Sequence, residues 1–309
     1  MYDTLKKCIY RLAICFLLAA AILITGCGGS DSPDPYIDSG EAFSFIFMSD
    51  TQADPETNDY TAFGGLLDQA VNHESAPKLL VLGGDTVNNG SSAEEWGAFR
   101  AAAGGRLDNM TVAAIAGNHD NKPLLAEQFD YPDESAESFF YTFIRGNVFF
   151  CMLDSNAMGG GNKKDADWLA DQLESNEASG ADWRIAVCHH PFWPVAEIPK
   201  DIQRAQTMRD VFLPIMEAGG IDLILCGHQH LYARTELFPD MDNVKNKMVQ
   251  IMVASGAKES YKPGEMDYIV TTTEAGNYLI VEAGKETLLI TAYGNTGEPF
   301  DSTAINRQV

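Results

Sequence analysis

Short apolar segments alternate with amphipathic helical patterns along most of the chain, and this alternation constrains the fold more than any other feature. Several segments are apolar throughout, as expected for central strands covered on both faces. The predicted strands are Phe43–Met48, Leu79–Leu82, Thr111–Ala116, Val148–Leu153, Trp183–Cys188 and Ile221–Cys226. Helices are predicted around Tyr60–Glu74, Ala93–Ala103, Lys164–Glu177 and Ile202–Ala218. We therefore predict an α/β protein.

After His230 the apolar segments follow one another without helical patterns between them. They are Met248–Ala254, Tyr268–Thr273, Tyr278–Glu282 and Thr287–Ala292. Such a series predicts hairpins that form a second sheet. The chain has 309 residues, of which 45% are hydrophobic, so it can bury one substantial core. We predict one folded domain over residues 42–309, and its cysteines, which lie in apolar segments, are expected to be buried: Cys151, Cys188 and Cys226.

The N-terminal residues have the composition of an export signal. Two lysines and one arginine precede an apolar run, Leu12–Gly26, which is short for a membrane span but suits a secretory signal. The run leads into Cys27 through Leu-Ile-Thr-Gly, which resembles the lipobox of bacterial lipoproteins. The resemblance implies a signal peptide over residues 1–26, a lipid anchor at Cys27 and export to the bacterial cell envelope, facing the periplasm or the cell surface. The polar residues 27–41 are predicted to be a flexible tether.

The formal net charge of the chain is −23. A nucleic-acid partner is not expected, because this composition lacks the clustered Lys and Arg that binding to a polyanion requires. The same charge would repel phosphate groups at long range unless strong positive charge, such as bound metal cations, lies in the site.

Polar side chains follow five of the predicted strands, at their carboxyl ends, where open α/β sheets bind ligands. The five turns read Asp50-Thr51-Gln52, Gly83-Gly84-Asp85, Gly117-Asn118-His119-Asp120, His189-His190-Pro191 and Gly227-His228-Gln229-His230. In an extended segment, residues two apart point to the same side. The side chains of Asp50 and Gln52 are therefore expected to point to one place, and so are those of His228 and His230. Taken singly these motifs are weak, but their joint occurrence after predicted strands is a strong signal.

Carboxylate, amide oxygen and imidazole are ligands that suit Mn, Fe, Zn or Mg. The candidate ligands exceed what a single ion takes: Asp50, Gln52, Asp85, Asn118, His189, His228 and His230. Clusters of two metal ions are a standard device for hydrolysing phosphate esters. The sequence therefore predicts a site for two divalent ions.

The five turns resemble the motifs of the calcineurin-like metallophosphoesterase superfamily, which run Asp-x-His, Gly-Asp, Gly-Asn-His-Asp/Glu, His and Gly-His-x-His. The resemblance covers Phe43 to about Ala292. It implies a four-layer α/β/β/α sandwich with two mixed sheets, and an enzyme that hydrolyses phosphoesters. It further implies that Asp85 bridges two ions, one held also by Asp50, Gln52 and His230, the other by Asn118, His189 and His228. His119 would then protonate the leaving group, with Asp120 orienting it.

The segment Gly227–Thr235 is similar in particular to the purple acid phosphatase branch. The tyrosine ligand of that branch is replaced here by Asn88, so a purple ferric site is not expected. Gln52 stands where many members have histidine, and a neutral amide oxygen should bind its ion more weakly.

Several alternatives remain open at this point. His190 either contacts phosphate or satisfies a backbone group, and Arg234 is either a phosphate clamp or a surface arginine. Phe192 and Trp193 are expected to pack in the core rather than form a rim for substrate. The motifs do not separate a phosphomonoesterase from a phosphodiesterase. A catalytically silent, metal-binding surface lipoprotein is the alternative from another class, whereas a serine hydrolase is disfavoured because no Gly-x-Ser-x-Gly motif is present.

Overall fold

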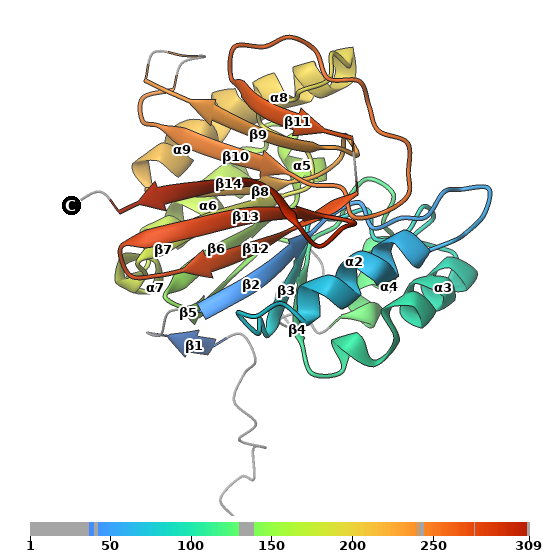
Figure 1. The fold of residues 1–309 in the computed structure, drawn as a ribbon. Coiled ribbons are helices and arrows are strands. Elements are labelled where there is room, and N and C mark those ends of the chain that lie inside the picture. The colour runs from blue at the N-terminus through green and yellow to red at the C-terminus, as the bar shows by residue number, and fades with distance from the viewer. Residues whose placement is uncertain are drawn as a thin grey trace, which may run out of the picture. The chain divides into compact units, whose positions relative to one another are not determined.

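Two β-sheets lie face to face in the computed structural model, and helices cover the outer face of each sheet (Figure 1). The structure describes residues 37–39, 43–129, 139–239, 241, 244–274 and 276–307. The predicted signal peptide and Cys27 lie outside the described residues, as does most of the predicted tether. The tether prediction is wrong at its end, because Ile37–Ser39 form strand β1, which pairs in parallel with β5.

The first sheet has eight strands in the order β1-β5-β6-β7-β8-β10-β9-β11. Its members beyond β1 are β5 (Tyr141–Gly146), β6 (Val148–Leu153), β7 (Trp183–Cys188), β8 (Leu223–Cys226), β9 (Tyr232–Leu237), β10 (Met248–Met252) and β11 (Ile269–Thr273). Its central strands, β6, β7, β8 and β10, run parallel, and antiparallel strands flank them.

The second sheet has six strands in the order β14-β13-β12-β2-β3-β4. They are β2 (Phe43–Met48), β3 (Leu79–Leu82), β4 (Thr111–Ala114), β12 (Asn277–Ala283), β13 (Thr287–Gly294) and β14 (Pro299–Asn306). The strands β2, β3 and β4 are parallel, and the C-terminal hairpins join them through the antiparallel pair of β12 and β2.

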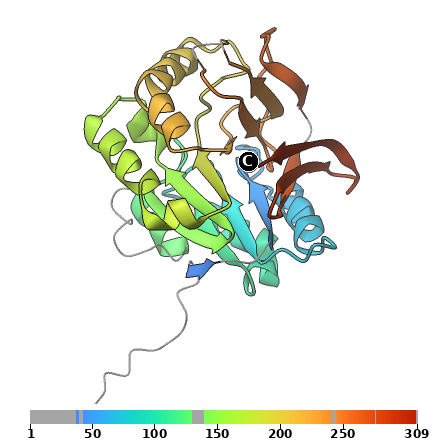
Figure 2. The same ribbon diagram turned by 90° about the vertical axis from the view of Figure 1, so that its left-hand side faces the viewer.

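One group of helices packs on each sheet, as the turned view in Figure 2 also shows. The second sheet is covered by α2 (Thr61–Val71), α3 (Ala93–Ala103) and α4 (Lys122–Gln128), with the short 3-10 helix η1 (Gly104–Leu107) after α3. The first sheet is covered by α5 (Ser155–Met158), α6 (Lys163–Leu173), α7 (Asn176–Gly180), α8 (Pro199–Val211) and α9 (Leu213–Ala218).

Alternation along the central strands distributes their side chains between three apolar layers. In β2, Phe45 and Phe47 pack between the sheets, whereas Ile46 and Met48 pack under the helices. Strands of this kind bury both faces, which explains why they are apolar throughout. The predicted four-layer α/β/β/α sandwich with two mixed sheets is confirmed.

The structure corrects two features of the predicted elements. The late strands do not form a sheet of their own: β9, β10 and β11 extend the first sheet, and β12 to β14 extend the second. The predicted helix Ile202–Ala218 begins at Pro199 and is interrupted at Phe212, after which α9 begins at Leu213 with Pro214 in its first turn. A proline in the first turn of a helix lacks only an N–H that would be unpaired there in any case, so it marks the new start.

The cysteines of the folded region are free and buried, as predicted. Each packs under the helices that cover the first sheet: Cys151, Cys188 and Cys226. In the part of the chain that the structure describes, no helix has the length and apolar character needed to span a membrane.

Candidate metal centre

The five polar turns follow parallel strands of the two sheets and meet at one end of the sandwich. Asp50, Asp85 and Asn118 come after β2, β3 and β4, which are neighbours in the second sheet. His189 and His228 come after β7 and β8, which are neighbours in the first. The carboxyl ends of parallel strands share one edge of a sheet, so the packing of two sheets brings both edges together.

The candidate ligand atoms lie within a few ångströms of one another. One ligand atom each from Asp50, Asp85 and His230 forms a group in which all atoms lie within 4.8 Å. His189 Nε2 lies 3.4 Å from Asp85 Oδ2 and 3.2 Å from Asn118 Oδ1, although the Asn118 side chain is otherwise exposed. The rings of His189 and His228 are 5.2 Å apart between centroids. Predicted ligands from all five turns therefore converge on one region, where Asp85 lies near Asp50 and His230 and also near His189. No contact places the Gln52 side chain with them among the described residues.

The backbone at the cluster adopts conformations that L-residues seldom occupy. The φ angles of Asp50, Asp85, His228 and His230 are 50°, 51°, 79° and 52°. Left-handed backbone at non-glycine residues costs free energy and gathers at functional sites. Gly227 is required by close approach, because a Cβ atom there would lie 2.0 Å from Asp50 Oδ2.

Several buried polar atoms at the cluster have no hydrogen-bond partner among the described residues. They are Asp50 Oδ1, Asp85 Oδ2 and both side-chain atoms of Gln52. An unpaired buried donor or acceptor costs about 1 to 3 kcal/mol, so unpaired atoms of this kind are rare in folded proteins. Three residues of the first two turns that each leave a buried ligand atom without a hydrogen bond fit a site for metal ions.

The buried carboxylates of the cluster favour positive charge at this place. Burial raises the pKa of Asp50 to about 7. Burial lowers the pKa of His189, but the Asp85 carboxylate and then Asp50 outweigh this effect and bring it to about 9. Without metal, protons on Asp50 and His189 offset the negative charge of the carboxylates. Bound cations would supply that positive charge instead.

His119 lies beside the cluster and is held by the backbone. Its own N–H donates to Asp85 Oδ1 over 2.8 Å, and its Nδ1 lies 2.7 Å from the carbonyl oxygen of Asn88. The prediction that Asp120 orients the His119 ring is wrong. The Asp120 carboxylate accepts instead from the backbone N–H groups of Asp85 and Thr86, and of Gly117, so it holds the turns together.

The two predicted substrate contacts are engaged elsewhere. His190 is 3% exposed, its Nδ1 lies 2.9 Å from the hydroxyl of Ser155, and its ring packs 4.2 Å from that of His228. This favours a packing role, although the partner is a side chain and not the predicted backbone group. The phosphate-clamp prediction for Arg234 is wrong, because its guanidinium is paired with Asp301 and Glu236.

Phe192 and Trp193 are fully buried in the core under the helices, as predicted. Two residues at the site carried no signal in the sequence. Asp201, on α8, places Oδ1 3.1 Å from His228 Nε2, and Lys258, between β10 and β11, places Nζ 3.1 Å from His119 Nε2. Both are far in sequence from the side chains that they approach, so no local spacing reveals them.

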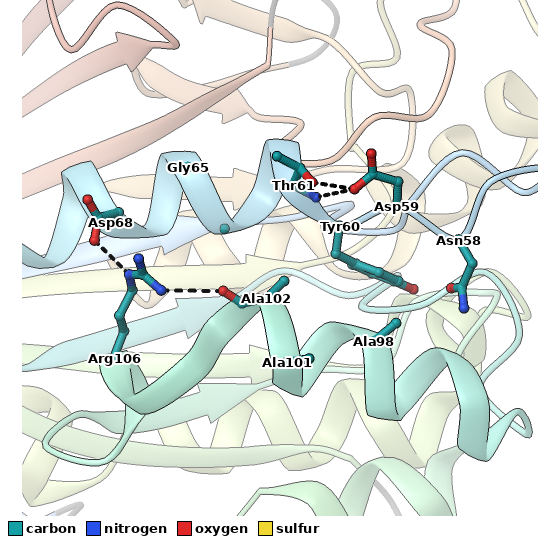
Figure 3. Close-up of a pocket in the computed structure, with 11 residues that line it drawn as sticks. Asn58, Asp59, Tyr60, Thr61, Gly65, Asp68, Ala98, Ala101, Ala102 and Arg106 are labelled. Atoms are coloured by element: carbon teal, nitrogen blue, oxygen red, sulfur yellow. Dashed lines mark hydrogen bonds and ion pairs between the residues drawn. The ribbon is translucent and has the colours of Figure 1, made fainter.

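A separate hollow of about 560 Å³ lies between α2 and α3 (Figure 3). Its rim includes the ion pair of Arg106 Nε and Asp68 Oδ1, which is 2.7 Å long. None of the residues that line it belongs to the five polar turns. The chemistry described above is therefore not located there.

Comparison with known proteins agrees with this geometry. Purple acid phosphatase 15 of Arabidopsis thaliana is 24% identical over 155 residues, which cover 45% of this chain and 27% of that protein. A purple acid phosphatase of Glycine max is 24% identical over 151 residues, 43% of this chain and 32% of that protein. The matched region thus spans a third or less of these relatives' length.

Solved structures show the same fold at low sequence identity. Purple acid phosphatase PPD1 from yellow lupin (Lupinus luteus) seeds has a TM-score of 0.74 at 17% identity, covering 87% of this chain and 54% of that chain. GAP50 of the Plasmodium inner membrane complex has a TM-score of 0.63 at 16% identity, covering 87% of this chain and 90% of that chain. The family model for calcineurin-like phosphoesterases matches residues 43–232, more than half of the chain and all five polar turns. This family uses pairs of divalent metal ions, and the protein belongs to it.

Proposed function

We propose that this chain is a metal-dependent phosphoester hydrolase. The observation that carries the proposal is the convergence of ligand atoms at the carboxyl ends of strands: those of Asp50, Asp85 and His230 lie within 4.8 Å of one another, and His189 Nε2 lies 3.4 Å from Asp85 Oδ2. Carboxylates, an amide and imidazoles in this number suit two divalent ions better than one. Purple acid phosphatases among the relatives support the same chemistry.

In this proposal Asp85 would be a ligand of both ions, because its carboxylate lies near Asp50 and His230 on one side and near His189 on the other. One ion is assigned to Asp50, Gln52 and His230, and the other to Asn118, His189 and His228. When bound, a pair of divalent ions lowers the pKa of a water molecule and neutralises charge on the phosphoryl oxygens. The chain's own ligands position the ions and exclude bulk water, since most of these side chains are buried.

His119 is the proposed general acid for the leaving group. Its Nδ1 is bonded to the Asn88 carbonyl, so Nε2, which lies 3.1 Å from Lys258 Nζ, is the ring atom that faces substrate and must carry a proton to act as the acid. A positioned general acid contributes on the order of 10² to 10⁴ in rate. Asp120 takes part only indirectly, by holding the turns that carry Asp85 and His119.

A metal add-back experiment tests the proposal. The purified protein is stripped of metal, and Mn, Zn, Fe or Mg is returned singly before hydrolysis of p-nitrophenyl phosphate and its bis-ester is measured. Metal-dependent hydrolysis of either ester is expected. Absence of hydrolysis with every ion, by protein that binds the metal, would contradict the enzymatic proposal.

That negative result would favour the second candidate, a catalytically silent, metal-binding surface protein. Gln52 is the observation on its side, because a neutral amide oxygen replaces a stronger imidazole ligand. GAP50, which shares the fold, is described as an anchor. The remaining candidate ligands and His119 are all present, which favours the enzyme.

We also propose export and lipidation, on the sequence of the N-terminal residues alone. Residues 1–26 would be removed and Cys27 acylated, so that the domain at residues 42–309 acts at the cell envelope. Mass spectrometry of the mature N-terminus tests this, with Cys27→Ser as the comparison. An unprocessed N-terminus, or a Cys27→Ser protein that stays in the membrane fraction, would contradict it.

A further inference from the structure

Lys258 places a positive charge at the proposed active site that the candidate metal ligands do not account for. It lies in the connection between β10 and β11, and its Nζ is 3.1 Å from His119 Nε2. Its ammonium charge also interacts with the carboxylates of Asp85 and Asp50. Burial lowers the pKa of Lys258, while Asp85 and Asp50 oppose that shift.

The backbone around Lys258 is held against the turns that carry the candidate ligands. The N–H of Ala257 donates to the carbonyl of Gln52 over 3.1 Å, and the carbonyl of Glu259 accepts from His230 Nδ1 over 2.8 Å. Lys258 therefore sits between two residues that are each bonded to a ligand turn. On either side, Ser255 donates to the carbonyl of Ser49, and Tyr261 to that of Gln229.

Gly256 shows how closely this connection approaches the site. A Cβ atom at that position would lie 2.2 Å from the carbonyl oxygen of Gln52 and 2.5 Å from that of Asp50. Only glycine permits the backbone to pass so near the first ligand turn. The close approach and the hydrogen bonds together fix where the Lys258 side chain begins.

The Lys258 ammonium is not neutralised by a carboxylate. Over the described ranges of the chain, no acidic oxygen lies within 4 Å of its Nζ. By contrast, Arg234 pairs with Asp301, and Lys122 pairs with Asp154. An unpaired ammonium is therefore available to an anionic ligand.

The contact with His119 defines which donors of Lys258 remain. The Asn88 carbonyl can only accept, so His119 Nδ1 carries a proton and donates to it. In the neutral ring Nε2 is then an acceptor, and Lys258 Nζ donates to it. An ammonium has three donors, so two remain for an anionic ligand beside Nε2 of the neutral ring. When the ring is protonated at Nε2, as its proposed role as acid requires, Nε2 no longer accepts and all three donors remain.

We propose that Lys258 is a substrate-binding, specificity-determining residue that holds the non-bridging oxygens of a terminal phosphate group. The inference rests on the proposed phosphoesterase function. A terminal phosphate carries about −1.5 to −2 charge near neutral pH and three acceptor oxygens. A diester carries one charge and two such oxygens, so an ammonium at this place favours monoesters over diesters.

The test compares the full chain with three variants, all loaded with Mn. Lys258→Gln removes the charge, Lys258→Arg keeps it, and Lys262→Gln makes the same charge change at an exposed lysine of the same connection. Binding of inorganic phosphate is measured by calorimetry. The ratio of kcat/KM for p-nitrophenyl phosphate to that for its bis-ester is measured at about pH 8, and bound Mn is measured to verify equal loading.

We expect Lys258→Gln to weaken phosphate binding by on the order of tenfold or more and to lower the monoester-to-diester ratio similarly, since it removes a charge-assisted hydrogen bond. Lys258→Arg should restore most of both, and Lys262→Gln should match the unchanged chain. Phosphate binding and an ester ratio in Lys258→Gln equal to those of Lys262→Gln would overturn the inference.

The proposed function can fail separately. If the unchanged chain hydrolyses neither ester yet binds phosphate in a manner that depends on Lys258, the hydrolase proposal fails and the role of Lys258 in phosphate binding stands. If it hydrolyses an ester but Lys258→Gln behaves like Lys262→Gln, only the role of Lys258 fails. If the unchanged chain neither binds phosphate nor hydrolyses either ester, both are overturned.

Discussion

Asp201 Oδ1 lies 3.1 Å from His228 Nε2, a contact between helix α8 and the turn after β8. The two atoms are not aligned for a hydrogen bond. Gln229 holds the carboxylate: its Nε2 donates to Asp201 Oδ2 over 3.1 Å, and its Oε1 accepts from the backbone N–H groups of Val195 and Ala196. A carboxylate beside a ligating imidazole orients the ring and increases its basicity. Asp201 is therefore a positioning residue for His228.

Asp201→Asn is expected to weaken metal binding by about 10- to 100-fold, which is the usual effect of losing such a partner. Calorimetric titration of the metal-free protein with Mn or Zn measures the change. Asp210→Asn is the matched control, since Asp210 is an exposed carboxylate on the same helix. Equal metal affinity in the two variants would show that Asp201 does not support His228.

His119→Ala is expected to keep its metal ions and to lose on the order of 10² to 10⁴ of its turnover. His119 contacts Asp85 through its backbone N–H, which alanine retains, so the ligand turn should remain in place. Metal content and kcat are measured on the same sample. His73→Ala serves as the comparison, because His73 bonds to Ser75 and Tyr293 away from the five turns. Unchanged turnover in His119→Ala would remove it from the mechanism.

The parallel strands could be predicted from the sequence because burial on both faces makes them apolar throughout. Phe43–Met48, Leu79–Leu82 and Val148–Leu153 were predicted with the bounds that the structure shows. The edge strand β14 could not be predicted in this way, since its residues alternate between exposed and half-buried and none is fully buried. Strand β5, at Tyr141–Gly146, likewise buries only part of its length and was missed.

The candidate site could be predicted where it depends on strand ends and not where it depends on long-range contacts. The turn order alone brought the candidate ligands into one hypothesis. Lys258 approaches His119 across 139 positions of sequence, and Asp201 is one of several acidic residues on or near a helix. Sequence adjacency also misled the prediction that Asp120 orients His119. Adjacent residues in a turn point in different directions, and the Asp120 carboxylate faces the backbone of Asp85.

Metal binding is expected to weaken as the pH falls, because ligands must release protons before they bind a cation. The pKa of His189 is about 9 and that of Asp50 is about 7 in the metal-free protein. Between pH 7 and 9 a binding metal ion displaces one proton, that of His189. The apparent affinity for the metal should therefore fall on the order of tenfold for each pH unit by which the pH is lowered. Below about pH 7 Asp50 also carries a proton that the metal must displace, so the affinity should fall more steeply with decreasing pH. Calorimetric titration with Mn at several pH values, in buffers of different ionisation enthalpy, measures both affinity and proton release. An affinity that does not vary with pH would contradict this linkage.

Arg234 joins the two sheets and does not bind phosphate in this structure. Its Nε lies 2.8 Å from Asp301 Oδ2 and its Nη2 lies 3.2 Å from Oδ1, so the pair is bidentate between β9 and β14. The two side chains are only 13% and 14% exposed. Arg234→Met is therefore expected to lose about 1 to 3 kcal/mol of stability, because it removes the positive partner of the Asp301 carboxylate in a mostly buried place and leaves it with neutral donors such as the hydroxyl of Tyr232. Thermal unfolding measures the loss, with Arg100→Met as the control, since Arg100 is exposed and bonds only to Gln128 among the described residues.

The KM for p-nitrophenyl phosphate should not change. A raised KM at unchanged stability would return Arg234 to the substrate site, and this outcome is not expected while both edges of its guanidinium are occupied by Asp301 and Glu236.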